Sequence, residues 1–207
     1  MASILNVDQI NNAAGTSAVT IDPSTGKPSF PNGVTLPAGS VLQVVHGTLP
    51  TSFTATGAAA SDYLVDIGLS ASITPIASNS KILIQTHLYV GMDFASASGY
   101  QQSYLIYKAG SVLNSVHGTS ESGRRPVAGM INMYSTATTA HHKMGMLSGT
   151  HMETNVGTTN ATTYAIYMRG YSGGPIIYVN RSQTYQSGGT DYDHNPSSTI
   201  TLMEIAQ

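Results

Sequence analysis

The chain has 207 residues, a formal net charge of −2 at pH 7, no Cys and no Trp, and only 9% of its residues are charged. Soluble globular domains usually carry about 25% charged residues. This composition excludes disulfides and thiolate metal sites, leaves few side chains for acid–base chemistry, and lacks the clustered basic charge that binds nucleic acid. No segment approaches the about 20 consecutive apolar residues of a membrane span, so we expect no membrane insertion.

Residues 1–39 are predicted to form an extended N-terminal attachment arm. Turn-forming residues interrupt the segment at 11–15, 22–26 and 31–33, and the apolar residues between the turns are too few to close a core. Such a segment gains order by lying on a partner. We expect its apolar side chains to be the docking anchors, namely Ile4, Val7, Ile10 and Phe30.

Residues 40–207 are predicted to form an all-β head domain, an antiparallel sandwich or jelly roll. Alternation with a period of two is clearest in 62–73 and 81–93, where one set of positions is apolar and the other largely polar. About ten short strands separated by turns are typical of these folds. The other predicted strands are Val41–Leu49, Tyr104–Lys108, Val112–His117, Met130–Tyr134, Lys143–Met152, Tyr164–Tyr171, Ile176–Arg181 and Thr199–Ala206.

Three of the predicted strands are apolar or aromatic on both faces, at 164–168, 176–179 and 200–205. A strand in a sandwich usually buries one face and exposes the other to water. A strand that is apolar on both faces needs a second cover, which is most simply another subunit. We therefore expect a homo-oligomer whose interface includes Tyr164, Tyr167, Ile176, Tyr178 and Met203.

The histidines give the nearest approach to a metal site, because His141, His142 and His151 lie in one segment. Adjacent residues on a strand point to opposite faces, so His141 and His142 cannot bind one ion there, and packing or an interface role is the preferred interpretation. The sequence contains no nucleophile, phosphate-binding or paired-carboxylate motif. We therefore predict no enzymatic activity, no cofactor and no metal.

Two polar segments are candidates for ligand contacts. Arg124 and Arg125 are the only adjacent basic residues, and they suit either a solvated surface or a phosphate or glycan contact. The second segment combines carboxylates with tyrosines that suit stacking on a sugar, and its members are Tyr185, Asp191, Tyr192 and Asp193.

Five stretches of the chain resemble virion surface proteins of tailed bacteriophages, of the tail-fibre or capsid-decoration type. They are Asn6–Thr16, Phe30–Val34, Leu69–Ile84, Tyr178–Thr184 and Ser198–Ile205. The resemblance implies a jelly roll similar to that of tumour necrosis factor, which assembles as a homotrimer on the virion surface after synthesis in the host cytoplasm. The partners that it implies are viral capsid or tail proteins, contacted through residues 1–39.

The leading functional hypothesis is a non-enzymatic virion structural protein, either a capsid decoration (cement) protein or a short tail fibre, whose loops contact host-surface glycan. One alternative is a lectin-like, carbohydrate-binding head for host receptor recognition. A second alternative is a spike that degrades polysaccharide. The sequence leaves the capsid and the tail both open as the location.

Overall fold

A computed structural model of the chain describes residues 8–11, 13–30, 36–56, 63–91, 93, 101–133, 142–170, 176–184 and 194–207. The chain divides into two compact units, Met1–Pro37 and Ala38–Gln207. This division falls close to the boundary after residue 39 that the sequence suggests. Each unit is described by itself below.

The first unit contains a small antiparallel sheet in the order β1 (Gln9–Asn11), β2 (Ser17–Ile21) and β3 (Pro28–Ser29). None of the side chains in these strands is buried. The turn after β2 is stabilised locally, because the Asp22 carboxylate accepts hydrogen bonds from the backbone N–H groups of Ser24 and Thr25 at 2.8 and 2.9 Å. Within the predicted arm, backbone pairing and turn bonds therefore form a small sheet that has no core.

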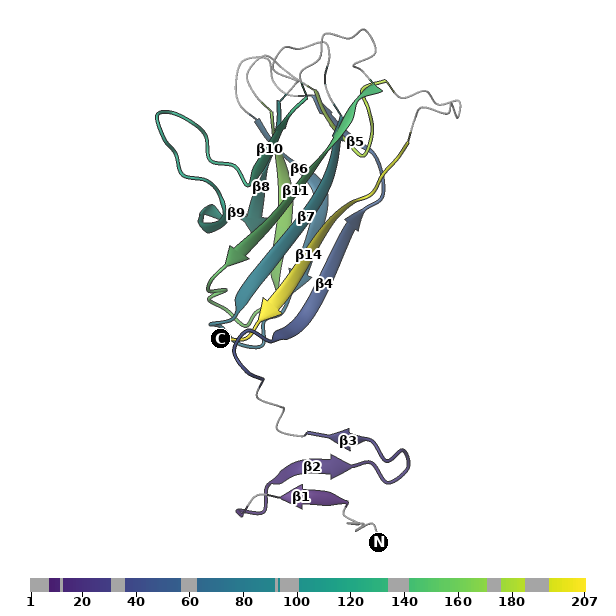
Figure 1. Ribbon diagram of the computed structural model, residues 1–207, viewed down its shortest axis with the longest axis vertical. Helices are drawn as coiled ribbons and strands as arrows, with labels where there is room; N and C mark the ends of the chain where they lie inside the picture. The colour runs from purple at the N-terminus through teal and green to yellow at the C-terminus, as the bar shows by residue number, and fades with distance from the viewer. Residues whose placement is uncertain are drawn as a thin grey trace. The chain divides into compact units, whose positions relative to one another are not determined.

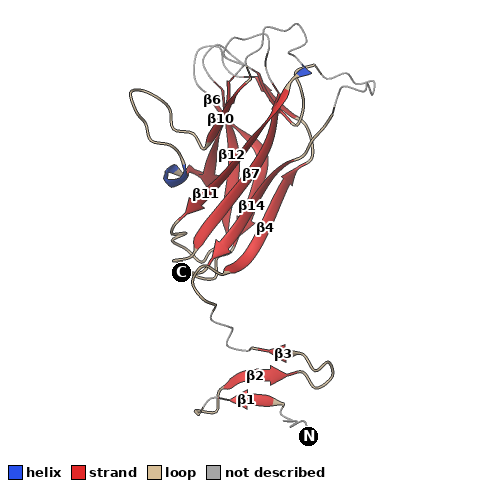
Figure 2. Cartoon of the chain, in the orientation of Figure 1, coloured by secondary structure: helices blue, strands red, loops and turns tan. Residues whose placement is uncertain are grey.

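The second unit is a sandwich of two antiparallel sheets (Figures 1 and 2). The strands of one sheet, in spatial order, are β10 (Gly129–Asn132), β8 (Gln101–Lys108), β12 (Thr162–Gly170) and β6 (Tyr63–Ile73), and the short strand β9 (Ser111–Val112) also pairs with β8. The strands of the other sheet are β4 (Val41–Leu49), β14 (Ser198–Ile205), β7 (Lys81–Gly91), β13 (Ile176–Val179) and β5 (Phe53–Thr56), and β11 (Met144–Glu153) pairs with the other edge of β7.

The long strands alternate between the two sheets along the chain. Strands β6, β8 and β12 lie in one sheet, whereas β7, β11 and β14 lie in the other. This crossover pattern is that of a jelly roll, so the predicted all-β, antiparallel fold is confirmed. The described part of the chain contains no α-helix, only the 3-10 turn η2 (Asn114–Val116), and thus no helix there is long and apolar enough to cross a membrane.

The core lies between the sheets and follows from the alternation in the sequence. Strand β6 buries Ile67, Leu69 and Ile73 at odd positions, and β7 buries Ile84 and Leu88 at even positions. Burying a side chain of this size contributes about 1.5–3 kcal/mol. The alternation predicted for both segments is confirmed, and it determines which side chains of these two strands point outward.

Candidate functional site

The outer edge of β8 is covered by two short strands with a long excursion between them. The last bond before the excursion runs from the backbone N–H of Leu113 to the carbonyl of Ile106, at 2.9 Å. The chain returns where the N–H of Ala128 donates to the carbonyl of Tyr104, at 2.8 Å. Residues 114–127 therefore leave the edge of the sheet and form a loop that begins with η2.

The side chain of His117 accepts a hydrogen bond at the edge of β8 that a neighbouring strand would otherwise accept. The N–H of Ile106 donates to Nε2 of His117 at 2.9 Å, so a ring nitrogen takes the place of a backbone carbonyl. Burial, with a smaller contribution from the nearby His151 and Arg169, lowers the pKa of His117 from 6.5 to about 4. The predicted strand Val112–His117 is wrong beyond residue 112, because the chain turns away from the sheet there. His117 bonds to β8 through its imidazole and not through its backbone.

The tip of the excursion is a tight turn at Glu121–Arg124. The N–H of Arg124 donates to the carbonyl of Glu121 at 2.9 Å, and the two central residues, Ser122 and Gly123, have φ values of 50° and 79°. Positive φ at both central positions is typical of a type I′ turn. The Ser120 hydroxyl donates to the carbonyl of Arg124 at 3.1 Å and closes the loop from within.

Two further bonds hold the base of this loop. The N–H of Gly118 donates to the carbonyl of Val127 at 3.2 Å, which joins the two ends of the loop. Nη1 of Arg169, on the neighbouring strand β12, donates to the carbonyl of Pro126 at 3.1 Å. The loop is therefore attached to the outer face of the β10–β8–β12–β6 sheet as well as to the edge of β8.

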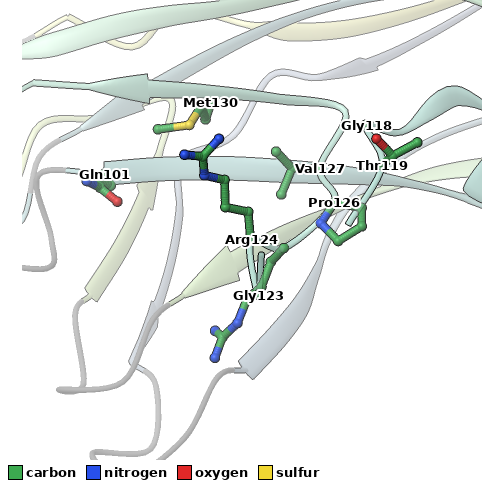
Figure 3. Close-up of a pocket in the computed structure, with 9 residues that line it drawn as sticks. Gln101, Gly118, Thr119, Gly123, Arg124, Pro126, Val127 and Met130 are labelled. Carbon is green, nitrogen blue, oxygen red and sulfur yellow. The ribbon is translucent and has the colours of Figure 1, made fainter. Parts of the chain in front are cut away.

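A pocket of about 480 Å³ lies between this loop and the sheet (Figure 3). Gln101 and Met130 come from β8 and β10, and the loop supplies the remaining lining. The lining residues are Gln101, Gly118, Thr119, Gly123, Arg124, Arg125, Pro126, Val127 and Met130. They include two arginines and no carboxylate, so the pocket is cationic. We name it the arginine pocket.

The outward side of the other sheet has a different character. The register aligns one outward residue from each of four neighbouring strands: Val44 on β4, Met203 on β14, Leu83 on β7 and Met152 on β11. Val44 is 57% and Met152 39% exposed. These four side chains form an apolar row across four of the six strands of the sheet.

The outward residues beside this row are polar but uncharged. The next two rows are His46, Thr201, Gln85, Thr150 and then Thr48, Thr199, His87, Ser148. Across the four strands, which are described throughout, Lys81 is the one Asp, Glu, Lys or Arg in an outward position, and it lies at the start of β7. We name this surface, from Val44 to Ser148, the uncharged face.

No family model matches the chain, and no curated protein is similar to it in sequence. The arginine pocket and the uncharged face therefore carry the functional argument, together with the resemblance in the sequence.

The residues predicted for the oligomer interface do not share one surface. Met203 lies in the apolar row of the uncharged face, and Ile176 is half-buried at the start of β13. Tyr178 is 6% exposed and lies against the Arg181 guanidinium, 5.4 Å from the ring centre. Tyr167 is on the opposite sheet and stacks on Tyr107 with ring centres 3.8 Å apart.

Tyr164 corrects the interface prediction. Its side chain is fully buried in the core, and its hydroxyl donates to the Glu153 carboxylate across the sandwich. The pKa of the Tyr164 hydroxyl is raised by burial and by the bond to Glu153 and its charge. The aromatic residues of this strand look apolar on both faces in the sequence, but the second sheet covers one of those faces.

Glu153 is the centre of a buried polar cluster that no sequence motif indicates. Its carboxylate accepts from the Lys108 ammonium group at 2.6 Å, and Lys108 also donates to the Val156 carbonyl at 2.6 Å. Glu153 belongs to β11, whereas Lys108 belongs to β8 in the other sheet. The ion pair thus connects the two layers of the sandwich.

His151, one of the three histidines weighed as a metal site in the sequence, takes part in a hydrogen-bonded cluster between the sheets. Nε2 of His151 shares a hydrogen bond of 3.0 Å with the Tyr104 hydroxyl. The Tyr104 hydroxyl also bonds to the Thr86 hydroxyl at 2.8 Å. Among the described residues, no group of three His, Asp or Glu side chains is placed to hold a metal ion. His141 lies outside the described residues.

The remaining predicted site residues divide between described and undescribed parts of the chain. Arg124 and Arg125 both line the arginine pocket. Ile10 and Phe30 are each 48% exposed in the first unit. Six others lie outside the described residues: Ile4, Val7, Tyr185, Asp191, Tyr192 and Asp193.

Sequence reasoning missed the residues that complete both surfaces. Gln101 gives no signal for the pocket, because it lies about 20 residues before the loop, and Met130, just after the loop, looks like an ordinary strand residue. Val44, Leu83 and Met152 could have been found from one signal. Apart from Lys81, the alternate positions of these strands that do not face the core contain no Asp, Glu, Lys or Arg, which is unusual for a surface exposed to water.

Proposed function

We propose that this chain is a non-enzymatic structural protein of a tailed-phage virion, displayed on the virion surface as a homotrimer. The observation that carries the proposal is the uncharged face, which can be buried without desolvating an ionic group at its centre. The resemblance of five stretches to phage surface proteins, in a chain with a jelly-roll head, supports the viral assignment and the threefold assembly.

The energetics favour burial of the uncharged face against a second copy of the chain. Apolar surface removed from water contributes about 25 cal/mol per Å² to the free energy of association. Assembly would bury the exposed parts of Val44, Met203 and Met152 and so release this free energy. The flanking threonines can hydrogen-bond across an interface as well as with water. A face with this composition is typical of a permanent interface, whose centre is poor in charged residues.

The first unit is proposed to dock on a capsid or tail protein. Ile10 and Phe30 are large apolar side chains that are each 48% exposed. Strands β1 and β3 are the two edges of its sheet, so their remaining backbone groups can pair with a strand of another protein. Docking through these features leaves the jelly roll to be displayed outward.

The oligomeric state of the purified full-length chain tests the assembly. Light scattering after gel filtration, from tens of micromolar to below one micromolar, should give three times the chain mass of 21.6 kDa. Met203→Lys places a charge in the apolar row and should yield monomers, whereas Ser70→Lys adds the same charge to the outer face of the other sheet and should remain trimeric. A wild-type monomer at every concentration contradicts the proposal.

Location on the particle tests the viral assignment. Immunogold electron microscopy of phage particles that encode this chain should label capsid or tail, and the labelled structure decides between them. The full-length variants Ile10→Asp and Phe30→Asp should still form trimers but should be missing from particles. Particles that contain no copy of the wild-type chain overturn the assignment.

A further inference from the structure

We infer that the arginine pocket binds an acidic sugar, that is, a carboxylate or sulfate group carried on a saccharide. The pocket lies on the outer face of the β10–β8–β12–β6 sheet, whereas the uncharged face belongs to the other layer of the sandwich. The pocket and the uncharged face therefore lie on the two opposite outer faces of the sandwich. The inference rests on the proposed function for the source of the ligand, a host-surface polysaccharide, and for the avidity that a trimer adds.

Charge is the first reason for an anionic ligand. Arg124 and Arg125 both line the pocket and are both exposed, and none of the other lining residues is charged. A guanidinium group binds planar carboxylates and sulfates through two parallel hydrogen bonds. In a chain with only eight Lys and Arg in total, two arginines in one pocket are a concentrated positive charge.

The neutral lining points to a saccharide as the carrier of the anion. Thr119 and Gln101 offer a hydroxyl and an amide that can bond to sugar hydroxyls, while Val127, Pro126 and Met130 offer apolar surface for the C–H face of a ring. Met130 is 53% exposed beside the pocket. A volume of about 480 Å³ is within the usual range for small-molecule sites.

The loop is preorganised by its own hydrogen bonds, which reduces the entropy lost on binding. The turn at Glu121–Arg124, the bond from Ser120 to the Arg124 carbonyl and the bond from Arg169 to Pro126 fix the backbone on both sides of the arginines. The ligand therefore meets a loop backbone that is already in place.

Nucleic acid is a poorer candidate for the same pocket. Binding to a phosphate backbone needs several cations along a groove, whereas this chain has a net charge of −2 and scattered basic residues. One cationic pocket in each subunit instead suits a repeating acidic polymer. Three copies in a trimer increase the affinity for such a polymer by avidity.

Isothermal titration of the full-length protein tests the inference with three probes. They are a tetramer of uronic acid residues, a neutral glucose tetramer and inorganic sulfate. We expect binding of the acidic tetramer and at least tenfold weaker binding of the other two. If the neutral tetramer binds as tightly as the acidic one, charge does not determine binding and the inference is overturned. If inorganic sulfate binds as tightly as the acidic tetramer, the sugar contributes nothing and the inference is also overturned.

Variants assign the binding to the pocket. Arg124→Gln should weaken binding of the acidic tetramer about 10-fold or more, because one charge-assisted, bidentate contact is lost. Arg124→Lys keeps the charge without the planar geometry and should give an intermediate loss. Lys27→Gln removes one positive charge from the first unit and should bind like the wild type. Wild-type affinity in Arg124→Gln overturns the inference.

The mass of each variant is measured in the same samples, so the two proposals fail separately. A trimer that does not bind the acidic tetramer refutes the sugar site alone. If the protein is a monomer that binds the acidic tetramer, and Arg124→Gln abolishes this binding, only the proposed assembly is refuted.

Discussion

Acid should destabilise this fold through His117, the residue that connects the pocket loop to β8. In the folded state Nε2 of His117 accepts the N–H of Ile106 at 2.9 Å, which requires a neutral ring. In the unfolded chain the pKa of this histidine is its ordinary 6.5, whereas in the fold it is about 4. As the pH falls from 6.5 to 4, the unfolded state takes up the proton first, so stability is lost across this window.

The size of the effect follows from the same two pKa values. The full difference between 6.5 and about 4 corresponds to about 3 kcal/mol. Because the ring of His117 is partly exposed and solvent screens its charge, we expect about 1–2 kcal/mol of this between pH 7 and pH 4.5. His151 acts in the same direction, since burial lowers its pKa and a hydrogen bond to Val116 only partly opposes this.

Urea unfolding at fixed protein concentration measures this loss. The chain has 12 Tyr and no Trp, so tyrosine fluorescence or circular dichroism is the signal. His117→Gln keeps an acceptor for the N–H of Ile106 but does not titrate, so it should lose about 1–2 kcal/mol less than the wild type between pH 7 and pH 4.5. His117→Phe leaves the buried Ile106 N–H without its acceptor and should cost about 1–3 kcal/mol at pH 7.

The comparison of His117→Gln with the wild type decides whether this reasoning holds. Equal loss of stability in the two proteins on acidification would mean that other groups cause the pH dependence. It would also remove His117 as the acid-sensitive anchor of the pocket loop.

Four other substitutions test the packing of the sandwich. Glu153→Gln and Lys108→Met should each lower the unfolding free energy by about 2–3 kcal/mol. The double variant should lose less than the sum of the two single losses, and additive losses would contradict the ion pair. Gly47→Ala should lower the melting temperature clearly, because a Cβ there lies 2.1 Å from the Ser70 carbonyl oxygen, and an unchanged value would contradict the close approach of β4 and β6. Ala109 has a φ of 47° in the β8–β9 turn, a conformation that Asn adopts more readily than Ala. Ala109→Asn should therefore raise the unfolding free energy by about 0.5–1 kcal/mol in thermal unfolding, and a decrease would contradict that conformation.

Part of the candidate site could be read from the sequence. Arg124 and Arg125 stand out in the sequence by their adjacency, which suits either a solvated surface or a ligand contact, and both line the pocket. Their partners Gln101 and Met130 could not be predicted, because a pocket between a loop and a sheet depends on how the excursion from β8 folds back. That path is set by side-chain bonds such as those of His117 and Arg169, which leave no local pattern.

The interface prediction shows where local patterns stop being sufficient. Tyr164 and Met203 both belong to strands that look apolar on both faces, yet Tyr164 is in the core and Met203 points outward. Alternation identifies the two faces of a strand but not which layer of the sandwich each face meets.

The sequence by itself determined the all-β class, the two-unit organisation near residue 39 and the alternate burial along β6 and β7. These follow from local rules, namely a period of two in apolar residues and turn formers between the strands. Only the tertiary structure decided that Val44, Leu83, Met152 and Met203 form one row and that Glu153 meets Lys108. These contacts depend on strand register and on the packing of residues far apart in the chain, which are fixed when the whole sandwich closes.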